Sequence, residues 1–429
     1  MNKVNCTVLL QKAGLFLFLI YIFFSSILGA YFSISILLCL VMFLMLLNVK
    51  IPRKNNFLFT KSYNDILFLA ALLFHTVYFC IFNKFLRSGI SELIIKAIIF
   101  LFANIIIWFL IYSDNWIKFL MDFCYVIALF FPLTTIIFFI FPDLCRAIMI
   151  PIWNDTVGGI AGGSYSAIHR AGFTTHYSYN GIFCAVSSLL CFVKVIFNKE
   201  RKYKLLLVVA FIGLLLTAKR AHLLFTVFAF IATYMLITPD KKGGRTIKGF
   251  FVLFLGFIAL IIASGFVPEL AATLERFNVG KDGDISSNRF DLWALAMNLF
   301  KTNPLLGIGW YGYPMSYGNY LILNDGNKFV NTHNVYIQVL CETGIVGLIC
   351  YLFIVLYVFF KTLNIIKIVY DSDKTYHFYC VISLSVQIFY LSYSLTGCCL
   401  YDSTFYFYAI ACAIVFHISR KLNQSKLTR

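Results

Sequence analysis

Long apolar runs dominate this chain and limit the folds that it can adopt. Hydrophobic residues make up 61% of the sequence and charged residues only 12%, about half the charged content of soluble domains. A run of about 20 apolar residues crosses the hydrocarbon core of a membrane as an α-helix. The chain is therefore predicted to be an all-α polytopic membrane protein, with one integral membrane domain over residues 1–429.

The apolar runs predict about twelve transmembrane helices. In the first half we expect them at 14–30, 32–49, 65–82, 92–112, 118–141 and 177–196. In the second half we expect them at 203–219, 221–238, 248–267, 334–360, 377–397 and 402–418. The stretch from Lys204 to Ile237 is too long for one crossing, so the polar residues 217–222 are predicted to form a tight turn at a membrane face.

The distribution of basic residues predicts the orientation. Placing both termini in the cytoplasm puts 23 of the 35 Lys and Arg on cytoplasmic segments and 12 on the other side, as the positive-inside rule favours. The outer face then carries the loops 142–176 and 268–333, the tight turn at 217–222 and a short turn at 398–402. Topology and contacts with membrane lipids account for the net charge of +17, so no nucleic acid is expected as a partner.

The thirteen cysteines lie mainly inside the predicted spans and are expected to be packing residues. No Cys-x-x-Cys pair or zinc-type spacing occurs, so neither a metal site nor a cofactor is predicted. Cys145, Cys398 and Cys399 could reach the outer face, where a disulfide is possible but not implied.

Two basic positions on the outer face are candidates for binding an anion. Arg220 lies where two spans meet, with Lys219 beside it, and two adjacent cations favour a multiply charged ligand. The alternative is that Arg220 reaches lipid phosphates. Arg289 begins an amphipathic segment at 290–300, where backbone amides also favour anions. The alternative there is an ordinary helix start paired to Asp291.

The amphipathic segment is too short to span the membrane, so we expect it on the outer membrane surface with Trp293 and Phe300 at the interface. The aromatic residues that follow it could stack on sugars or form an interfacial belt. They are Trp310, Tyr311, Tyr313, Tyr317 and Tyr320.

A histidine lies where the long outer loop enters the tenth predicted span. His333 can titrate near neutral pH at such a boundary, and the buried carboxylate of Glu342 follows it in the same helix. At about 1.5 Å and 100° per residue, the two side chains lie on opposite faces and are not a direct acid–base pair. His333 is therefore the candidate base, and Glu342 and Asn334 are candidate positioning residues.

Three blocks of sequence, taken in order, resemble the O-antigen ligase and polymerase family of bacterial envelopes. They are Leu-Thr-Ala-Lys-Arg-Ala at 216–221, Asn-Arg-Phe-Asp-Leu-Trp-Ala at 288–294 followed by Asn-Pro-Leu-Leu-Gly-Ile-Gly at 303–309, and Thr-His-Asn-Val-Tyr-Ile-Gln at 332–338 followed by Glu-Thr-Gly at 342–344. The resemblance covers about residues 165–360. Its main departure is Ala218-Lys219, where the family commonly has Gly-Ser.

The resemblance implies a C-type glycosyltransferase (GT-C) bundle in the bacterial cytoplasmic membrane. Such an enzyme acts at the outer face on glycans linked to undecaprenyl diphosphate, without a metal or nucleotide sugar. The family's two arginines correspond to Arg220 and Arg289, and its histidine to His333. Lys219 and Arg170 are further candidates for contacting the diphosphate.

The function expected from this resemblance is a polysaccharide repeat-unit polymerase for O-antigen or capsule, with a chain-length regulator as a possible partner. The rival in the same chemistry is an O-antigen ligase that delivers the chain to lipid A-core in lipopolysaccharide synthesis. A lipid-linked oligosaccharide flippase or other transporter is the alternative from another class, although no inverted repeat is visible in the sequence.

The orientation can be tested by cysteine labelling. In an otherwise cysteine-free variant, a cysteine near Gly283 should react with a membrane-impermeant thiol reagent in spheroplasts, because the long loop is predicted to lie outside. A cysteine near Gly243 should not react until the membrane is permeabilised. The reverse labelling pattern would put the candidate site in the cytoplasm and contradict the predicted orientation.

Overall fold

The computed structural model describes residues 3–28, parts of 67–78, 116–152, 169–237, 289–320 and 330–427. The regular structure of these residues is helical, without a strand. The all-α prediction is thus confirmed for the described residues. The predicted spans 32–49, 92–112 and 248–267 lie outside them, as does much of 65–82.

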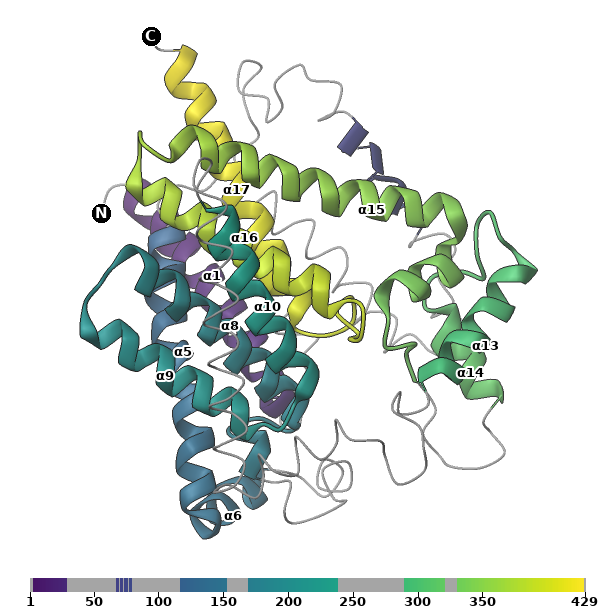
Figure 1. The fold of residues 1–429 in the computed structure, drawn as a ribbon, viewed down its shortest axis with the longest axis horizontal. Coiled ribbons are helices and arrows are strands. Elements are labelled where there is room, and N and C mark those ends of the chain that lie inside the picture. The colour runs from purple at the N-terminus through teal and green to yellow at the C-terminus, as the bar shows by residue number, and fades with distance from the viewer. Residues whose placement is uncertain are drawn as a thin grey trace.

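Long helices form a bundle in which helices from both halves of the chain pack together (Figure 1). They are α1 (Lys3–Leu28), α5 (Trp116–Ile140), α8 (Tyr177–Phe197), α9 (Arg201–Leu216), α10 (Arg220–Leu236), α15 (Val335–Val369), α16 (Lys374–Tyr393) and α17 (Thr404–Leu427). Shorter elements are α6 (Pro142–Ile152), the 3₁₀ turn η3 (His169–Ala171), α13 (Arg289–Thr302) and α14 (Gly312–Tyr320).

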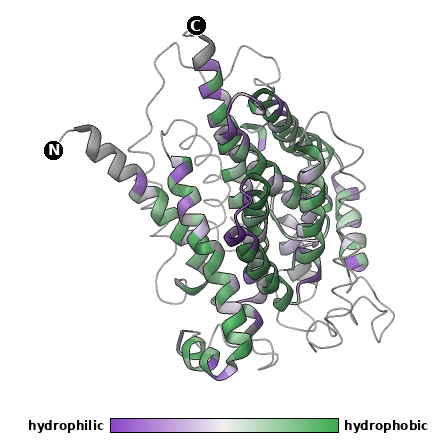
Figure 2. Ribbon diagram, turned by 60° about the vertical axis from the view of Figure 1, so that its left-hand side comes forward, coloured by the Kyte–Doolittle hydropathy of each residue, from purple (hydrophilic) through white to green (hydrophobic). Residues whose placement is uncertain are grey.

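Four of the described helices are long and apolar enough to cross a membrane, namely Trp116–Ile140, Tyr177–Phe197, Val335–Val369 and Thr404–Gln424. Lys12–Phe24 and Arg220–Leu236 are shorter apolar helices. Hydrophobic residues cover most of the bundle helices in Figure 2. An integral membrane protein is therefore supported, while the number of about twelve spans and the GT-C architecture stay predictions.

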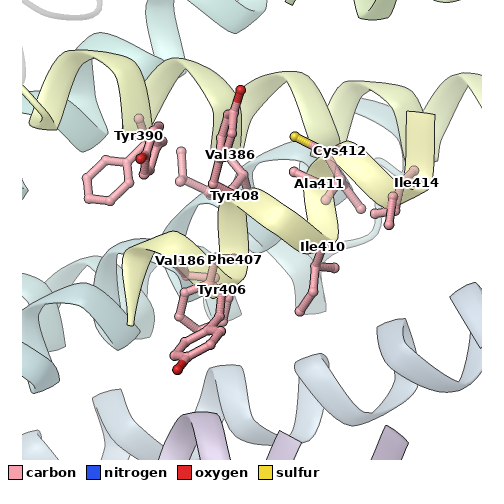
Figure 3. Close-up of a cluster of buried hydrophobic side chains, with 14 of the residues drawn as sticks. Val186, Val386, Tyr390, Tyr406, Phe407, Tyr408, Ile410, Ala411, Cys412 and Ile414 are labelled. Atoms are coloured by element: carbon pink, nitrogen blue, oxygen red, sulfur yellow. The ribbon is translucent and has the colours of Figure 1, made fainter. Parts of the chain in front are cut away.

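The centre of the bundle is built from tightly packed aromatic and aliphatic side chains of α8, α16 and α17 (Figure 3). The ring of Tyr390 stacks on that of Tyr408, with centroids 4.1 Å apart. The hydroxyl groups of Tyr390 and Tyr351 are 3.1 Å apart, so these two buried phenols are polar partners of each other. These contacts join α15, α16 and α17 into one unit.

The predicted loop 142–176 contains a helix that the span prediction did not include. Pro142 suits the first turn because it lacks an N–H that would have no partner there, and Asp143 lies in the same turn. Cys145 and Met149 lie one helical turn apart and pack against Phe138 of α5. These contacts fold α6 back onto the end of α5.

Helix α15 is broken at Gly344, where the backbone has φ 67° and ψ −170°. Its axis changes there because a residue with positive φ cannot continue the helix. The helix also continues to Val369, beyond the predicted end at residue 360. Lys361 and Lys367 lie in this extension. Their charged ends can reach water, as expected where a helix leaves the hydrocarbon core of the membrane.

The segment 304–309 supplies the backbone hydrogen bonds that the break removes. The N–H groups of Ile345 and Val346 donate to the carbonyl oxygens of Pro304 (2.9 Å) and Leu305 (3.3 Å). In return, the N–H groups of Ile308 and Gly309 donate to the carbonyls of Cys341 (3.1 Å) and Glu342 (2.9 Å). Unpaired backbone groups in a membrane cost several kcal/mol each, so this exchange is required for the break.

Glycine at 344 and 307 is predicted to be essential for stability. A Cβ on Gly344 would overlap the Leu305 carbonyl, and one on Gly307 would overlap the Glu342 carbonyl, both at positive φ. Gly344→Ala or Gly307→Ala should therefore lower the free energy of unfolding by at least about 2 kcal/mol, measured as a lower thermal midpoint in detergent.

Gly312→Ala is the comparison variant, because the nearest neighbours of its Cβ would be side-chain atoms of Ile308, the closest at 2.9 Å, rather than backbone atoms, and its φ is not positive. It should lower the midpoint less than the other two substitutions. If Gly344→Ala unfolded at the same temperature as Gly312→Ala, the backbone hydrogen bonds between segment 304–309 and the break in α15 would not be a main source of stability.

Candidate catalytic site at one end of the bundle

The predicted site residues gather at the end of the bundle where α8, α10, α15 and α17 begin and α9 and α16 end. Three contacts bring these helix ends together. The Val335 N–H donates to the Ser394 carbonyl (2.9 Å), and the rings of His222 and Tyr393 are 4.5 Å apart. His333 Nδ1 lies 3.3 Å from the sulfur of Cys398.

The tight turn predicted between α9 and α10 is confirmed. The Thr217 hydroxyl donates to the Leu214 carbonyl (2.7 Å) at the end of α9, and Arg220 is the first residue of α10. Ala218 has φ 55°, a conformation that glycine adopts without strain. This is the position where the resembled family commonly has glycine, so alanine here brings local strain.

Lys219 is held close to the start of α8. Its Nζ lies 4.1 Å from the centroid of the Tyr177 ring, in a cation–π contact. The Tyr177 ring also stacks on His176, with the ring centroids 4.2 Å apart. Burial, and then the charge of Lys219, lower the pKa of His176 to about 4. Lys219 and Arg220 are both half-buried.

His333 occupies a strained turn immediately before α15, with φ 53°. The turn is fixed on the helix side by Asn334, whose side-chain oxygen caps α15 by accepting from the Ile337 N–H (3.1 Å). It is fixed on the loop side by Thr332, whose hydroxyl donates to the Asn334 carbonyl (2.7 Å). Asn334 therefore has a helix-capping position beside the candidate base.

Two cations act on the His333 imidazole. Burial, and then the charges of Arg289 and Lys219, lower its pKa to about 4. These residues come from the beginnings of α13 and α10 and from the turn before α15, which are far apart in the sequence. The fold thus brings together His333, Arg289 and Lys219, with Arg220 next to Lys219 in the chain. At neutral pH the imidazole is uncharged.

Helix α13 carries Arg289 and packs on α15 through the buried residues Leu292 and Ala296. The indole N–H of Trp293 donates to the Thr332 carbonyl (2.9 Å), next to His333. The Tyr313 hydroxyl donates to the Leu292 carbonyl (3.1 Å). The structure therefore gives Trp293 a role in attaching α13 to the His333 turn, and its predicted position at the membrane interface stays a prediction.

Glu342 is buried just before the break in α15, where its carboxylate accepts hydrogen bonds from three segments. They come from Gln338 Nε2 (3.0 Å), the Tyr401 hydroxyl (2.8 Å) and the Tyr313 N–H (3.4 Å). These donors belong to α15, the 398–402 turn and α14, so the carboxylate joins three segments around the site. No contact links it directly to His333 among the described residues.

Arg170 lies apart from this network, on η3 between α6 and α8. Its carbonyl accepts from the Asn180 side chain (2.8 Å), which also donates to the Thr135 hydroxyl (2.8 Å). Its Nε is buried without a hydrogen-bond partner among the described residues. The structure thus anchors the backbone of Arg170, and among the described residues no hydrogen bond or ion pair joins its side chain to His333 or Arg289.

Two residues of the 398–402 turn were missed as site candidates. Cys398 was considered only for a disulfide, although its sulfur contacts His333. Asp402 caps α17 by accepting from the Thr404 N–H (2.8 Å), and burial raises its pKa to about 6. An acid in a short outer turn before a span was the only sequence signal for Asp402.

Three of the aromatic residues that follow α13 are buried in the core. The sequence suggested either sugar stacking or an interfacial belt for them, and neither interpretation included burial. Trp310, Tyr311 and Tyr313 are at most 2% exposed. Tyr311 also has a positive φ, of 57°. Ala218, Tyr311 and His333 are the non-glycine residues with positive φ in the described part of the chain. These three residues lie at this end of the bundle, and backbone strain of this kind clusters at functional sites.

The fold and site define an all-helical membrane protein with basic residues around a neutral histidine. No group of three or more His, Cys, Asp or Glu side chains within the described ranges could hold a metal ion.

Residues 205–352 match the family model described as O-antigen ligase. This match confirms the resemblance inferred from the three sequence blocks, to an O-antigen ligase and polymerase type of protein. The matched segment includes Lys219, Arg220, Arg289, His333 and Glu342, whereas Arg170 and Cys398 lie outside it. Comparison with curated proteins found no match.

Proposed function

We propose that this protein is a polysaccharide repeat-unit polymerase at the outer face of the cytoplasmic membrane. It would transfer a growing glycan from undecaprenyl diphosphate to the sugar end of a fresh lipid-linked repeat unit. The observation that carries the proposal is the convergence of Arg289 and Lys219 on His333 at one end of an apolar bundle. The match to the O-antigen ligase family model supports the same chemistry.

The proposed reaction needs a base and a cationic site for the leaving group. The acceptor hydroxyl would give its proton to His333 while its oxygen attacks the anomeric carbon of the donor glycan. The bond from that carbon to the phosphate oxygen breaks, and the diphosphate leaves with the electron pair. Arg220 and Arg289, assisted by Lys219, would stabilise the negative charge that develops there. Attack opposite the leaving group inverts the anomeric carbon.

An O-antigen ligase is the second candidate, favoured by the description of the matched family model. It would use the same donor, base and cations, and would differ only in the acceptor. Supplying the purified protein with either a lipid-linked repeat unit or lipid A-core separates the two reactions. Extension of the repeat unit supports the polymerase, and transfer to lipid A-core alone supports the ligase.

Removing either arginine should abolish chain extension. Arg220→Ala and Arg289→Ala each remove a charge-assisted phosphate contact, and we expect the rate to fall on the order of 10²-fold or more. Lysine at either position should restore activity only in part, because the paired N–H groups of the guanidinium are lost. The measurement is the polymer ladder formed by variants whose membrane levels equal the wild type.

Lys301→Ala is the matched control for Arg289→Ala, because Lys301 is an exposed cation in the last turn of the same helix. It should leave the ladder unchanged. Near-normal ladders from both arginine variants would remove the diphosphate site from the proposal.

His333→Ala and His333→Gln should both leave single repeat units on the lipid carrier. Glutamine can form hydrogen bonds but cannot act as a base near neutral pH. The pKa of His333 is lowered to about 4, so the base remains unprotonated as the pH falls from 8 to 5.5. The kcat/KM of the wild type should therefore show no histidine-dependent loss near pH 6.5, the usual pKa of histidine.

This prediction is measured with purified components in the presence of a metal chelator, where we expect activity to persist. Normal polymerisation by His333→Gln would show that the histidine only orients or packs. A halving of the wild-type kcat/KM as the pH falls through 6.5 would contradict the lowered pKa of His333.

A further inference from the structure

His222 is a buried polar residue to which the proposed reaction gives no role. It is the third residue of α10, and its side chain belongs to a residue that is only 2% exposed. Both ring nitrogens are buried, and neither has a hydrogen-bond partner among the described residues. An imidazole carries at least one N–H in either protonation state. A donor is therefore buried here without an acceptor, which costs free energy in the folded protein.

The close neighbours of the His222 ring do not supply that acceptor. The ring of Tyr393 lies 4.5 Å away between centroids, at an interplanar angle of 41°. On the side of α8, a Cβ on Gly181 would lie 3.4 Å from His222 Cγ and Nδ1 and 3.3 Å from Lys219 Cγ. The imidazole and the stem of Lys219 therefore pack against the same point of α8. Lysine has no acceptor atom in its charged side chain.

His222 is directed toward the cationic start of α10. The Cα–Cβ bond of a helical residue is tilted toward the N-terminus of its helix, so this side chain extends toward Lys219 and Arg220. Lys219 makes no side-chain cap at the start of α10, and the positive end of the helix dipole adds to the two side-chain charges. Positive charge thus lies beside an N–H that lacks an acceptor. An anion with acceptor oxygens satisfies both.

Two other polar groups on the buried face of α10 are a useful comparison. The hydroxyls of Thr226 and Thr233 are also buried without a hydrogen-bond partner within the described part of the chain. A threonine hydroxyl inside a helix can reach the carbonyl of the preceding turn by rotation of its side chain. His222 lies in the first turn and has no helical turn before it. Its N–H therefore needs an acceptor from outside the helix.

We propose that His222 is a further ligand of the diphosphate of the lipid-linked donor, and that its ring N–H donates to a phosphate oxygen beside Lys219 and Arg220. The proposal rests on the proposed function. Before the donor binds, the Lys219 ammonium lies on the Tyr177 ring, 4.1 Å from its centroid. The flexible lysine side chain turns from Tyr177 to the phosphate, and this movement exposes the imidazole beside it.

The test measures binding of undecaprenyl diphosphate, the carrier without a glycan, to the purified protein in lipid nanodiscs. His222→Phe keeps an aromatic ring against Tyr393 and removes both nitrogens. Its Kd should rise at least about tenfold, because a charge-assisted hydrogen bond is lost. Its thermal midpoint without ligand should equal or exceed that of the wild type, because an unpaired buried donor has been removed. An unchanged Kd would overturn the proposal.

Two conservative variants test the hydrogen bond itself. His222→Asn and His222→Gln each keep an amide N–H in place of the imidazole N–H. At least one of them should bind undecaprenyl diphosphate more tightly than His222→Phe does. If neither did, the imidazole would contribute its shape and not its N–H, and the proposal would be overturned.

Thr233→Val is the matched control, because it removes an unpaired buried hydroxyl from the same face of the same helix, about 16 Å farther along its axis. It should bind undecaprenyl diphosphate as the wild type does. A loss of affinity in His222→Phe that appeared only with the glycan-bearing carrier would place His222 at the sugar and overturn the proposal. The expected loss in a protein that does not polymerise would count against the polymerase alone.

Discussion

The break in α15 and its exchange of backbone hydrogen bonds with segment 304–309 determine how the rest of the site is assembled. Because the N–H groups of Ile345 and Val346 are paired outside their own helix, segment 304–309 cannot leave α15 without exposing unpaired amides in an apolar environment. The same exchange holds α14 and the C-terminal end of α13 against the first turns of α15. Arg289, on α13, is in this way kept near His333.

Among the described residues, the non-glycine residues with positive φ lie at this end of the bundle, together with the polar network around Glu342. Ala218 and His333 adopt left-handed backbone conformations that cost of order 1 kcal/mol or more each. The surrounding structure stabilises them through Thr217, Asn334 and the Gln338–Glu342 hydrogen bond. The proposed chemistry therefore lies where the fold stabilises strained turns, and these turns hold a neutral histidine close to cationic side chains.

The sequence predicted much of the fold and the principal site residues. Apolar runs located α5, α8, α10 and α15 because hydrophobic length is a strong signal in membrane proteins, and the basic turn after α9 is clear from Lys219 and Arg220. The break at Gly344, the burial of Trp310 and the Cys398 contact could not be predicted. Each depends on tertiary pairing between distant segments, and an isolated glycine, tryptophan or cysteine has many environments open to it.

The central claim is that one end of this bundle binds a lipid-linked diphosphate between arginines and presents its sugar to His333. A cryo-electron microscopy structure of the protein with an undecaprenyl-diphosphate-linked repeat unit tests it most directly. The account predicts diphosphate oxygens within hydrogen-bonding distance of the guanidinium groups of Arg220 and Arg289, about 2.7–2.9 Å, with the His333 ring facing the sugar. Diphosphate density elsewhere on the protein, away from both arginines, would contradict it.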